Sequence, residues 1–240
     1  MFKFVHLIKK NIRRLRMLLF RRAYISRDLE NNIVDNFTRL YADSYYFGQA
    51  WNTTTWRGHH VHKCPNDLWM YQEIIFDRKP DVVIETGTSR GGSALFLANM
   101  CDMAGKGKVI TVDIKVKNDH RPKHDRLTYL LGSSISDEIV EKLKSMIKPD
   151  DRVLVILDSR HHKYHVIEEL KIYQQFIKVD DYLIVEDSFL NGHPIHPDFG
   201  PGPMEAIEEF LKENKNFVSD RDKERHFLTF NPKGYLKRVK

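Results

Sequence analysis

Short apolar runs alternate with segments of helical pattern through most of the chain. Continuous apolar runs are typical of strands buried on both faces, and apolar residues recurring every three or four positions predict the helices between them. This alternation indicates an α/β fold with a doubly wound, mostly parallel sheet covered by helices on both faces. The expected strands are 82–85, 109–113, 127–131, 153–158 and 182–187, and the helices between them are 93–103, 136–147 and 165–177.

Further elements flank this pattern. Helices are predicted over 28–47, from Asp67 to the residues before Pro80, and over 203–214. Two more strand-like runs, 227–231 and 235–239, complete a seven-stranded sheet. The stretch from Gly48 to Pro65 has no regular period and is rich in aromatic residues, threonine and histidine, which predicts a loop over a site.

The N-terminal residues 1–27 form a distinct basic arm, separate from a domain over 28–240. Within 2–22, apolar residues at helical spacing predict an amphipathic helix whose other face is filled with Lys and Arg. Such a helix suits the surface of an anionic membrane. It equally suits packing on the body or on a second subunit, and a mitochondrial transit peptide is a weaker alternative.

The net charge also differs between residues 1–27 and the rest of the chain. The whole protein has 39 Lys and Arg against 33 Asp and Glu, a net charge of +6. Nine of the basic residues and none of the acidic ones lie in 1–27, so the remainder carries −3 and gives no reason to expect nucleic acid. Two cysteines provide no disulfide framework, and no apolar stretch is long enough to span a membrane. We therefore expect a cytoplasmic protein, with peripheral contact at the inner face of a membrane through residues 1–22 as an alternative.

A glycine-rich turn follows the first strand of the pattern and leads into a helix. It reads Glu85-Thr86-Gly87-Thr88-Ser89-Arg90-Gly91-Gly92-Ser93, an acid-x-Gly-x-x-x-Gly spacing that lacks the GxGxxG dinucleotide fingerprint and the P-loop lysine. Asp113 ends the next strand, where a carboxylate can accept hydrogen bonds from ribose hydroxyls, and Ser133 follows the third. This spacing is that of the class I methyltransferases and predicts S-adenosylmethionine as the cofactor. The predicted cofactor residues are Glu85, Gly87, Thr88, Ser89, Gly91, Ser93, Asp113 and Ser133.

Three carboxylates follow the fourth and fifth strands. Asp158 ends one strand, and Glu186 and Asp187 end the next. Close together in a partly dry cleft they would repel one another unless a cation neutralised them, and oxygen ligands favour Mg²⁺. His161 comes three residues after Asp158, close enough to take a proton from a hydroxyl at such an ion. We therefore predict a Mg²⁺ site of these three acids, with Asp158 and His161 as the catalytic residues.

Ten segments together resemble the cephalosporin hydroxylase / rhamnosyl O-methyltransferase family, a branch of the Rossmann-like class I methyltransferases. The resemblance covers residues 45–240, and its most specific parts are Leu-Asp-Ser-x-His-x-x-x-His-Val from Leu157 and Val-Glu-Asp from Val185. It implies the same Mg²⁺ ligands and the same base. The segments are Trp56–Gly58, Lys63–Leu68, Tyr71–Ile74, Ile84–Thr88, Gly91–Ser93, Leu157–Val166, Tyr182–Asp187, Asn191–Pro194, Gly200–Ala206 and Asn231–Leu236.

The sequence thus predicts a Mg²⁺- and S-adenosylmethionine-dependent O-methyltransferase acting on a sugar hydroxyl of a glycoside, glycolipid or glycosylated natural product. The loop Trp51–His62 and the segment Asn191–Pro203 are expected on the acceptor side, with Trp56, His59, Asn191 and His193 as candidate substrate residues. Two alternatives stay open: a metal-dependent hydroxylase or other oxidoreductase on the same fold, and a non-catalytic, membrane-attached binding protein. The sequence leaves the acceptor and the oligomeric state open, a homo-oligomer included.

Overall fold

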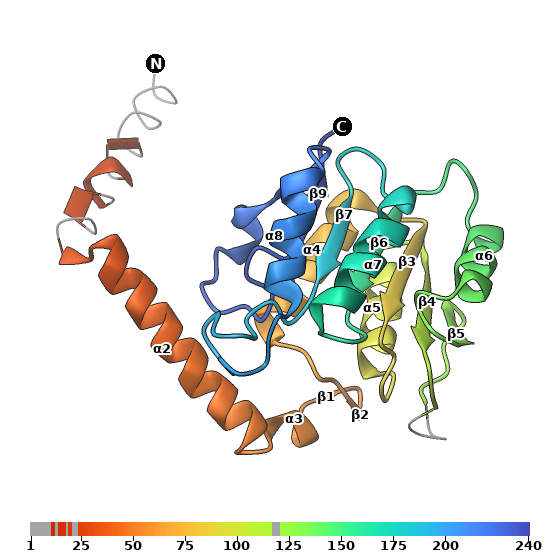
Figure 1. Cartoon of the computed structure of the whole chain (residues 1–240), viewed down its shortest axis with the longest axis horizontal. Coiled ribbons are helices and arrows are strands. Elements are labelled where there is room, and N and C mark those ends of the chain that lie inside the picture. Colours follow the sequence, from red (N-terminus) through yellow and green to blue (C-terminus); the bar gives the residue numbers. More distant parts are fainter. Residues whose placement is uncertain (1–10, 13, 18, 21–23, 117–120) are drawn as a thin grey trace.

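The computed structural model describes residues 11–12, 14–17, 19–20, 24–116 and 121–240. A seven-stranded sheet runs through its centre in the order β5-β4-β3-β6-β7-β9-β8 (Figure 1). The five strands from β5 to β7 are parallel, and β9 is antiparallel to both β7 and β8. The predicted fold class is therefore confirmed. The strands are β3 (Val82–Thr86), β4 (Lys108–Asp113), β5 (Leu127–Leu131), β6 (Val153–Leu157), β7 (Tyr182–Val185), β8 (Phe217–Ser219) and β9 (Tyr235–Arg238).

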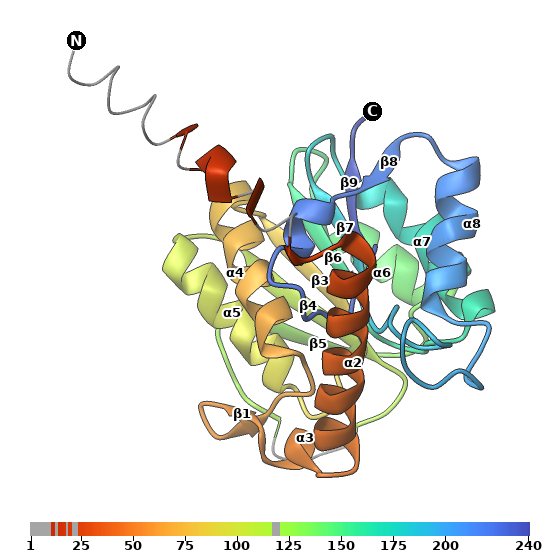
Figure 2. The ribbon, with the colours of Figure 1, turned by 90° about the vertical axis from the view of Figure 1, so that its left-hand side faces the viewer.

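Helices pack on both faces of this sheet, with α4 and α5 on one side and α7 and α8 on the other (Figure 2). Their bounds lie within about two residues of the predicted ones, except that α7 ends early and continues as a short 3₁₀ turn, η1 (Gln174–Phe176). The helices are α2 (Arg27–Tyr46), α3 (Ala50–Thr53), α4 (Pro65–Arg78), α5 (Gly92–Ala104), α6 (Asp137–Met146), α7 (Lys163–Tyr173) and α8 (Pro203–Glu213), with a second 3₁₀ turn η2 (Arg221–Glu224).

Alternate residues of the central strand β3 feed two separate hydrophobic layers. Val82 and Ile84 pack in the layer formed with α6, α7 and α8, whereas Val83 packs in the layer formed with α4 and α5. Successive side chains of a strand point to opposite faces, so a strand covered on both sides must be apolar at every position. This is why the strand appears in the sequence as a continuous apolar run.

The loop before α4 contains more structure than the sequence predicts. It holds the short helix α3 and a two-stranded hairpin of β1 (Thr55–Trp56) and β2 (His59–His60). The hairpin packs on the start of α5, where the carbonyl oxygen of His60 lies 2.0 Å from the position a Cβ on Gly92 would take. Only a glycine at position 92 permits this approach, which fixes the hairpin beside the carboxyl ends of the central strands.

The strand predicted over 227–231 is wrong. The segment is irregular, and the last strand-like stretch before β9 is β8 instead. Side chains accept hydrogen bonds from two of its backbone amides: the Phe230 amide donates to Asp67, and the Asn231 amide donates to the hydroxyl of Thr229. Leu228, Thr229 and Phe230 are all buried in succession, a pattern that a buried strand and a buried loop share.

The basic arm is described only in part, since residues 1–10, 13, 18 and 21–23 lie outside the described residues. The described residues between 11 and 20 are helical. Their large apolar side chains are exposed, from Ile12 at 49% to Met17 and Phe20 at 66%. Among the described residues no helix is long and apolar enough to cross a membrane. Contact of the arm with a membrane surface, with a second subunit or with the body stays a prediction.

Asp67, in the first turn of α4, ties that helix to the C-terminal segment. Its buried carboxylate accepts hydrogen bonds from the Thr229 hydroxyl at 2.5 Å, the Phe230 amide at 2.9 Å and the Tyr235 hydroxyl at 2.8 Å. Burial raises the pKa of Asp67 to about 6, although these hydrogen bonds oppose the shift. The folded state therefore keeps a proton at Asp67 at pH values where the unfolded chain has released it.

We predict that this carboxyl makes stability fall as the pH rises from about 4 to about 6, because the folded state then binds more protons than the unfolded state. Asp67→Asn, whose amide can pair with the two rotatable hydroxyls, should remove that slope. The expected difference in the pH-dependent change of unfolding free energy is about 3 kcal/mol over this window, measured by urea titration. The exposed Asp150→Asn should retain the wild-type slope. Parallel curves for wild type and Asp67→Asn would contradict the prediction.

Candidate active site

The glycine loop after β3 closes against the end of β6. Gly87 has φ +94°, and a Cβ there would lie 1.8 Å from the carbonyl oxygen of Asp158. Both the left-handed conformation and the close approach require glycine. Gly91, with φ +84°, then starts helix α5. The loop therefore lies at the carboxyl ends of the strands, where ligands bind in doubly wound sheets.

A cavity of about 780 Å³ opens at this edge of the sheet. Of the predicted cofactor residues, Gly87, Ser89, Asp113 and Ser133 line it. Asp113 also fixes the loop, because its carboxylate accepts a hydrogen bond from the Ser89 amide at 2.9 Å. A carboxylate has room for further donors, so Asp113 can hold the loop and still accept from a ligand.

The remaining cofactor candidates lie beside or beneath the loop. Thr88, Gly91 and Ser93 line a smaller pocket of about 20 Å³. Glu85 is fully buried and accepts a hydrogen bond from Thr111 at 2.7 Å, and Thr111 in turn pairs with Thr88. Burial raises the pKa of Glu85. Its place beneath the loop makes Glu85 a support of the loop conformation rather than a residue lining the large cavity.

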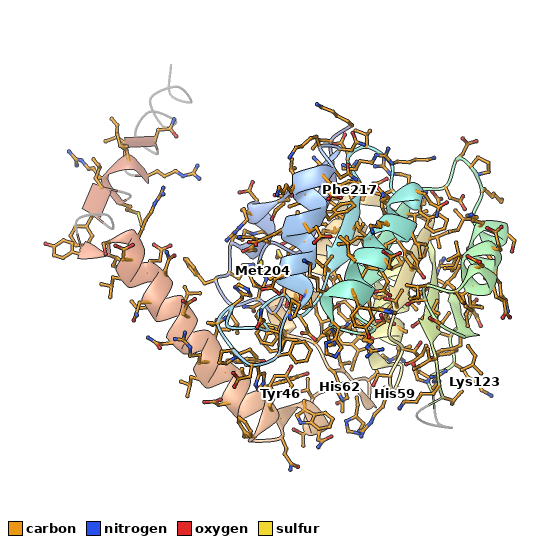
Figure 3. All side chains as sticks on the ribbon, viewed as in Figure 1. Tyr46, His59, His62, Lys123, Met204 and Phe217 are labelled. Carbon is orange, nitrogen blue, oxygen red and sulfur yellow. The ribbon has the colours of Figure 1, made fainter. Side chains whose placement is uncertain are left out.

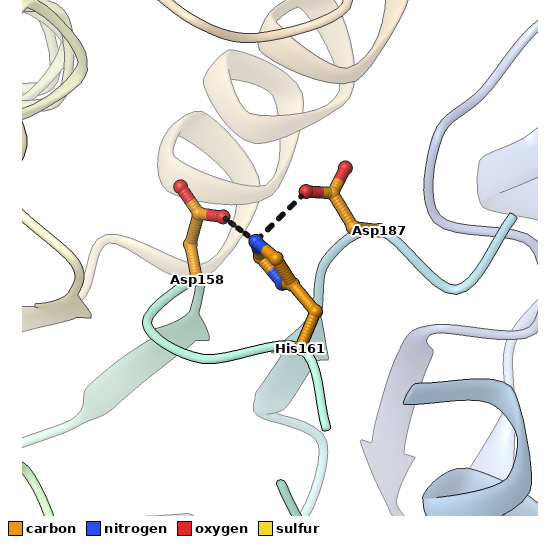
Figure 4. A group of neighbouring side chains, drawn as sticks. All are labelled: Asp158, His161 and Asp187. Atoms are coloured by element: carbon orange, nitrogen blue, oxygen red, sulfur yellow. Dashed lines mark ion pairs between the residues drawn. The ribbon is translucent and has the colours of Figure 1, made fainter. Parts of the chain in front are cut away.

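Asp158, His161 and Asp187 all line the large cavity, and Figure 4 shows their side chains close together. One ligand atom from each lies within 4.8 Å of the others. His161 Nε2 is 3.2 Å from Asp187 Oδ2 and 4.0 Å from Asp158 Oδ1. The two carboxylate oxygens at this spacing fit a hard divalent cation, and the imidazole nitrogen lies beside them.

Glu186, the third predicted metal ligand, lies outside this group. Its carboxylate is held by the Lys63 ammonium at 2.7 Å and by the Tyr71 hydroxyl at 2.8 Å. Glu186 does not line the large cavity, whereas Asp187 does. The positive φ of Asp187, +56°, turns its side chain toward His161, and Asn231 accepts a hydrogen bond from its amide.

Lys63 neutralises the buried acids from behind. It is 3% exposed and contacts both Asp158 and Glu186. Burial alone would lower the pKa of Lys63, but the two carboxylates outweigh burial and hold it well above its usual value. The second oxygen of Asp158 remains directed to His161. Lys63 therefore fixes one oxygen of Asp158 and leaves the other to the cavity.

The four substrate residues predicted from the sequence do not line the cavity. The Trp56 indole donates to Asn99 and packs edge-on against Phe96, while His59 sits in the β1–β2 hairpin. Asn191 and His193 both contact Glu205 in the first turn of α8. Burial raises the pKa of Glu205, but hydrogen bonds from His193, the Gly202 amide and Asn191 lower it to about 2, so this cluster is a hydrogen-bonded cap at the start of α8.

Aromatic residues from α2 and α3 line the far side of the cavity instead. These are Tyr45, Tyr46 and Trp51, joined by His62. Figure 3 labels Tyr46 and His62 at the lower edge of the domain, where α2, α3 and the hairpin meet. The expected loop Trp51–His62 thus contributes its two end residues. The sequence does not single out Tyr45 and Tyr46, because two tyrosines on a helix are typical of ordinary packing. It does not single out Lys63 as a site residue either, because the acidic partners of Lys63 are far away in the sequence.

The sheet order, the glycine loop with its acidic partner and the acid–histidine group define a Rossmann-like methyltransferase. The chain belongs to the family described as rhamnosyl O-methyltransferase/CmcI, whose model matches residues 48–239. This membership confirms the predicted enzyme class, an O-methyltransferase.

Curated relatives agree with the family. A rhamnosyl O-methyltransferase of Mycobacterium leprae is 39% identical over 207 residues, covering 84% of this chain and 90% of the relative. The rhamnosyl O-methyltransferase of Mycobacterium tuberculosis strain H37Rv is 39% identical over 208 residues, covering 84% and 85%.

Solved structures show the same fold at lower identity. A structure of CmcI with Mg and SAM is similar with a TM-score of 0.61 and 18% identity, covering 78% of this chain and 77% of CmcI. The O-methyltransferase TomG from Streptomyces achromogenes has a TM-score of 0.51 and 13% identity, covering 93% and 95%.

We predict that Lys63→Met lowers the free energy of unfolding by about 3–5 kcal/mol in the presence of a chelator, because it leaves two buried carboxylates without a counter-charge. Urea denaturation followed by circular dichroism measures this loss. Lys171→Met, which removes an exposed lysine paired with Glu168, is the matched control and should leave the free energy of unfolding nearly unchanged. Equal stability of the two variants would contradict the prediction.

Proposed function

We propose that this protein transfers a methyl group from S-adenosylmethionine to a sugar hydroxyl of a glycoside, glycolipid or glycosylated natural product, with the help of Mg²⁺. One observation carries the proposal: a single cavity joins the glycine loop and Asp113 to the group of Asp158, His161 and Asp187. A cofactor half and a reaction group in one cavity are what methyl transfer to a bound acceptor requires.

The cofactor half is formed by the ends of β3, β4 and β5. Gly87 and Ser89 present open backbone to the amino-acid end of the cofactor, and Asp113 accepts the ribose hydroxyls. Ser133 borders the adenine, while Thr88, Gly91 and Ser93 support the loop from the smaller pocket. Glu85, through Thr111 and Thr88, holds the loop from below.

Asp158 and Asp187 would hold Mg²⁺, because their carboxylate oxygens are the hard ligands that this ion prefers. When bound, the ion lowers the pKa of a hydroxyl beside it. Glu186 keeps Lys63 in place and so fixes the orientation of Asp158. The solved structure of CmcI with Mg and SAM supports the pairing of these two ligands on this fold.

His161 is the proposed general base. As the acceptor oxygen attacks the sulfonium methyl carbon, the C–S bond breaks and its electron pair stays on sulfur, leaving S-adenosylhomocysteine. The hydroxyl proton passes to His161 Nε2, and Asp187, 3.2 Å away, stabilises the resulting imidazolium. The rhamnosyl O-methyltransferase relatives, which are 39% identical, support a sugar acceptor.

The direct test incubates the full-length protein with S-adenosylmethionine, Mg²⁺ and methyl α-L-rhamnopyranoside, and follows the products by mass spectrometry. We expect a product heavier by one CH₂ and an equal amount of S-adenosylhomocysteine. EDTA or Asp158→Asn should abolish turnover, while S-adenosylhomocysteine binding measured by calorimetry stays within about threefold, because other strand ends hold the cofactor. Absence of the methylated product with the cofactor bound, or absence of S-adenosylmethionine binding in calorimetry, would contradict the proposal.

His161→Ala should lower kcat by roughly 10²- to 10⁴-fold, because the acceptor proton then has no positioned base. Cofactor binding should remain within about threefold of the wild type. The control is His226→Ala, at an exposed position away from the cavity, which should leave kcat unchanged. An unchanged single-turnover rate for His161→Ala would remove the proposed base.

A further inference from the structure

One side of the cavity is made of residues that are assigned neither to the cofactor nor to the acid–histidine group. Its wall is formed by Tyr45 and Tyr46 at the end of α2, Trp51 of α3, and His62 after the hairpin. We call these four residues the aromatic wall. The family model matches residues 48–239, so the two tyrosines precede the matched segment.

Two polar atoms of the aromatic wall lack partners. The Tyr45 hydroxyl and His62 Nε2 are buried and make no hydrogen bond to any residue that the structure describes. A buried polar atom left unpaired is costly, and in a native protein it calls for a ligand, water or ion to pair with it. Both residues line the cavity, so a ligand bound there would pair with these two atoms after a side-chain shift that exposes them.

The aromatic wall suits an uncharged ring with hydroxyl groups. Burial lowers the pKa of His62 to about 4, so its imidazole is neutral near pH 7, and burial keeps the Tyr45 phenol protonated by raising its pKa. A sugar hydroxyl both donates and accepts, so it can satisfy a phenol and an imidazole nitrogen alike. The rings of Tyr46 and Trp51 offer apolar surface for the C–H face of a pyranose.

Packing holds these rings in place. Tyr46 stands edge-on to Tyr45 at a centroid distance of 5.2 Å, and Trp51 stands edge-on to His62 at 4.8 Å. Tyr45 also packs edge-on against Phe230, which lines the same cavity. Since the wall is ordered before any ligand arrives, little side-chain entropy is lost on binding.

We propose that the aromatic wall is the subsite that holds the sugar ring of the acceptor, with the Tyr45 hydroxyl and His62 Nε2 bonded to hydroxyls of that ring. This assignment rests on the proposed methyl transfer to a sugar. It places the reacting hydroxyl toward His161, which lines the same cavity beside Asp187. The wall therefore selects the ring, whereas the acid–histidine group activates one of its hydroxyls.

The kinetic test uses methyl α-L-rhamnopyranoside, its monodeoxy analogues and methyl α-D-glucopyranoside with the full-length protein. Tyr45→Phe and His62→Phe should each raise KM for the preferred glycoside about three- to tenfold, the loss of one neutral hydrogen bond, with kcat changed less than twofold. One monodeoxy analogue should bind wild type and Tyr45→Phe equally well, which assigns that hydroxyl to Tyr45. Tyr41→Phe, on the same helix but not lining the cavity, is the matched control and should keep the wild-type KM.

A binding test separates this proposal from the reaction. Titrating each glycoside into the protein saturated with S-adenosylhomocysteine should change the tryptophan fluorescence, because Trp51 lies in the subsite. Trp51→Phe should abolish the change, and Trp69→Phe, at an exposed position, should retain it. A fluorescence change without any methyl transfer would refute the proposed function and support the subsite. No change with any glycoside, or an unaltered KM in both wall variants, would overturn the subsite.

Discussion

The buried contact of Lys63 with Asp158 and Glu186 is the constraint around which the active site is arranged. The carboxyl ends of parallel strands lie at one edge of the sheet. At this edge Asp158 follows β6, and Glu186 and Asp187 follow β7. Buried carboxylates of like charge destabilise the fold unless a cation compensates them. Lys63, from the segment just before α4, supplies that charge from within the protein, so the site can be assembled without an external ion.

This internal cation divides the acids by role. Glu186 receives both Lys63 and the Tyr71 hydroxyl, and Tyr71 in turn accepts a hydrogen bond from Asn231. Asp187, the next residue, is turned the other way by its positive φ and meets His161. Asn231 connects the two, since its side-chain oxygen also accepts the Asp187 amide. One buried network thus fixes the ammonium on one side and the open acid–histidine group on the other.

The sequence predicts what local pattern controls. Apolar runs identified β3 to β7, and the rule that ligands bind at the carboxyl ends of parallel strands identified Gly87, Asp113, Asp158 and Asp187 as cavity residues. It fails where a contact joins distant segments. Lys63 meets Asp158 across 95 positions, and nothing near Lys63 signals that partner. Likewise, the pattern of 227–231 predicts a strand, although the Phe230 amide of this segment donates to Asp67, far earlier in the chain.

The candidate acceptor residues show the same limit in another form. Trp56 is of a residue type that suits sugar binding. Its indole N–H, however, donates a hydrogen bond to Asn99, and its ring packs against Phe96. Tyr45 looks like a packing residue, yet its hydroxyl is unpaired and lines the cavity. Residue type alone therefore identifies candidates, whereas the structure shows which of their polar atoms already have hydrogen-bond partners and which do not.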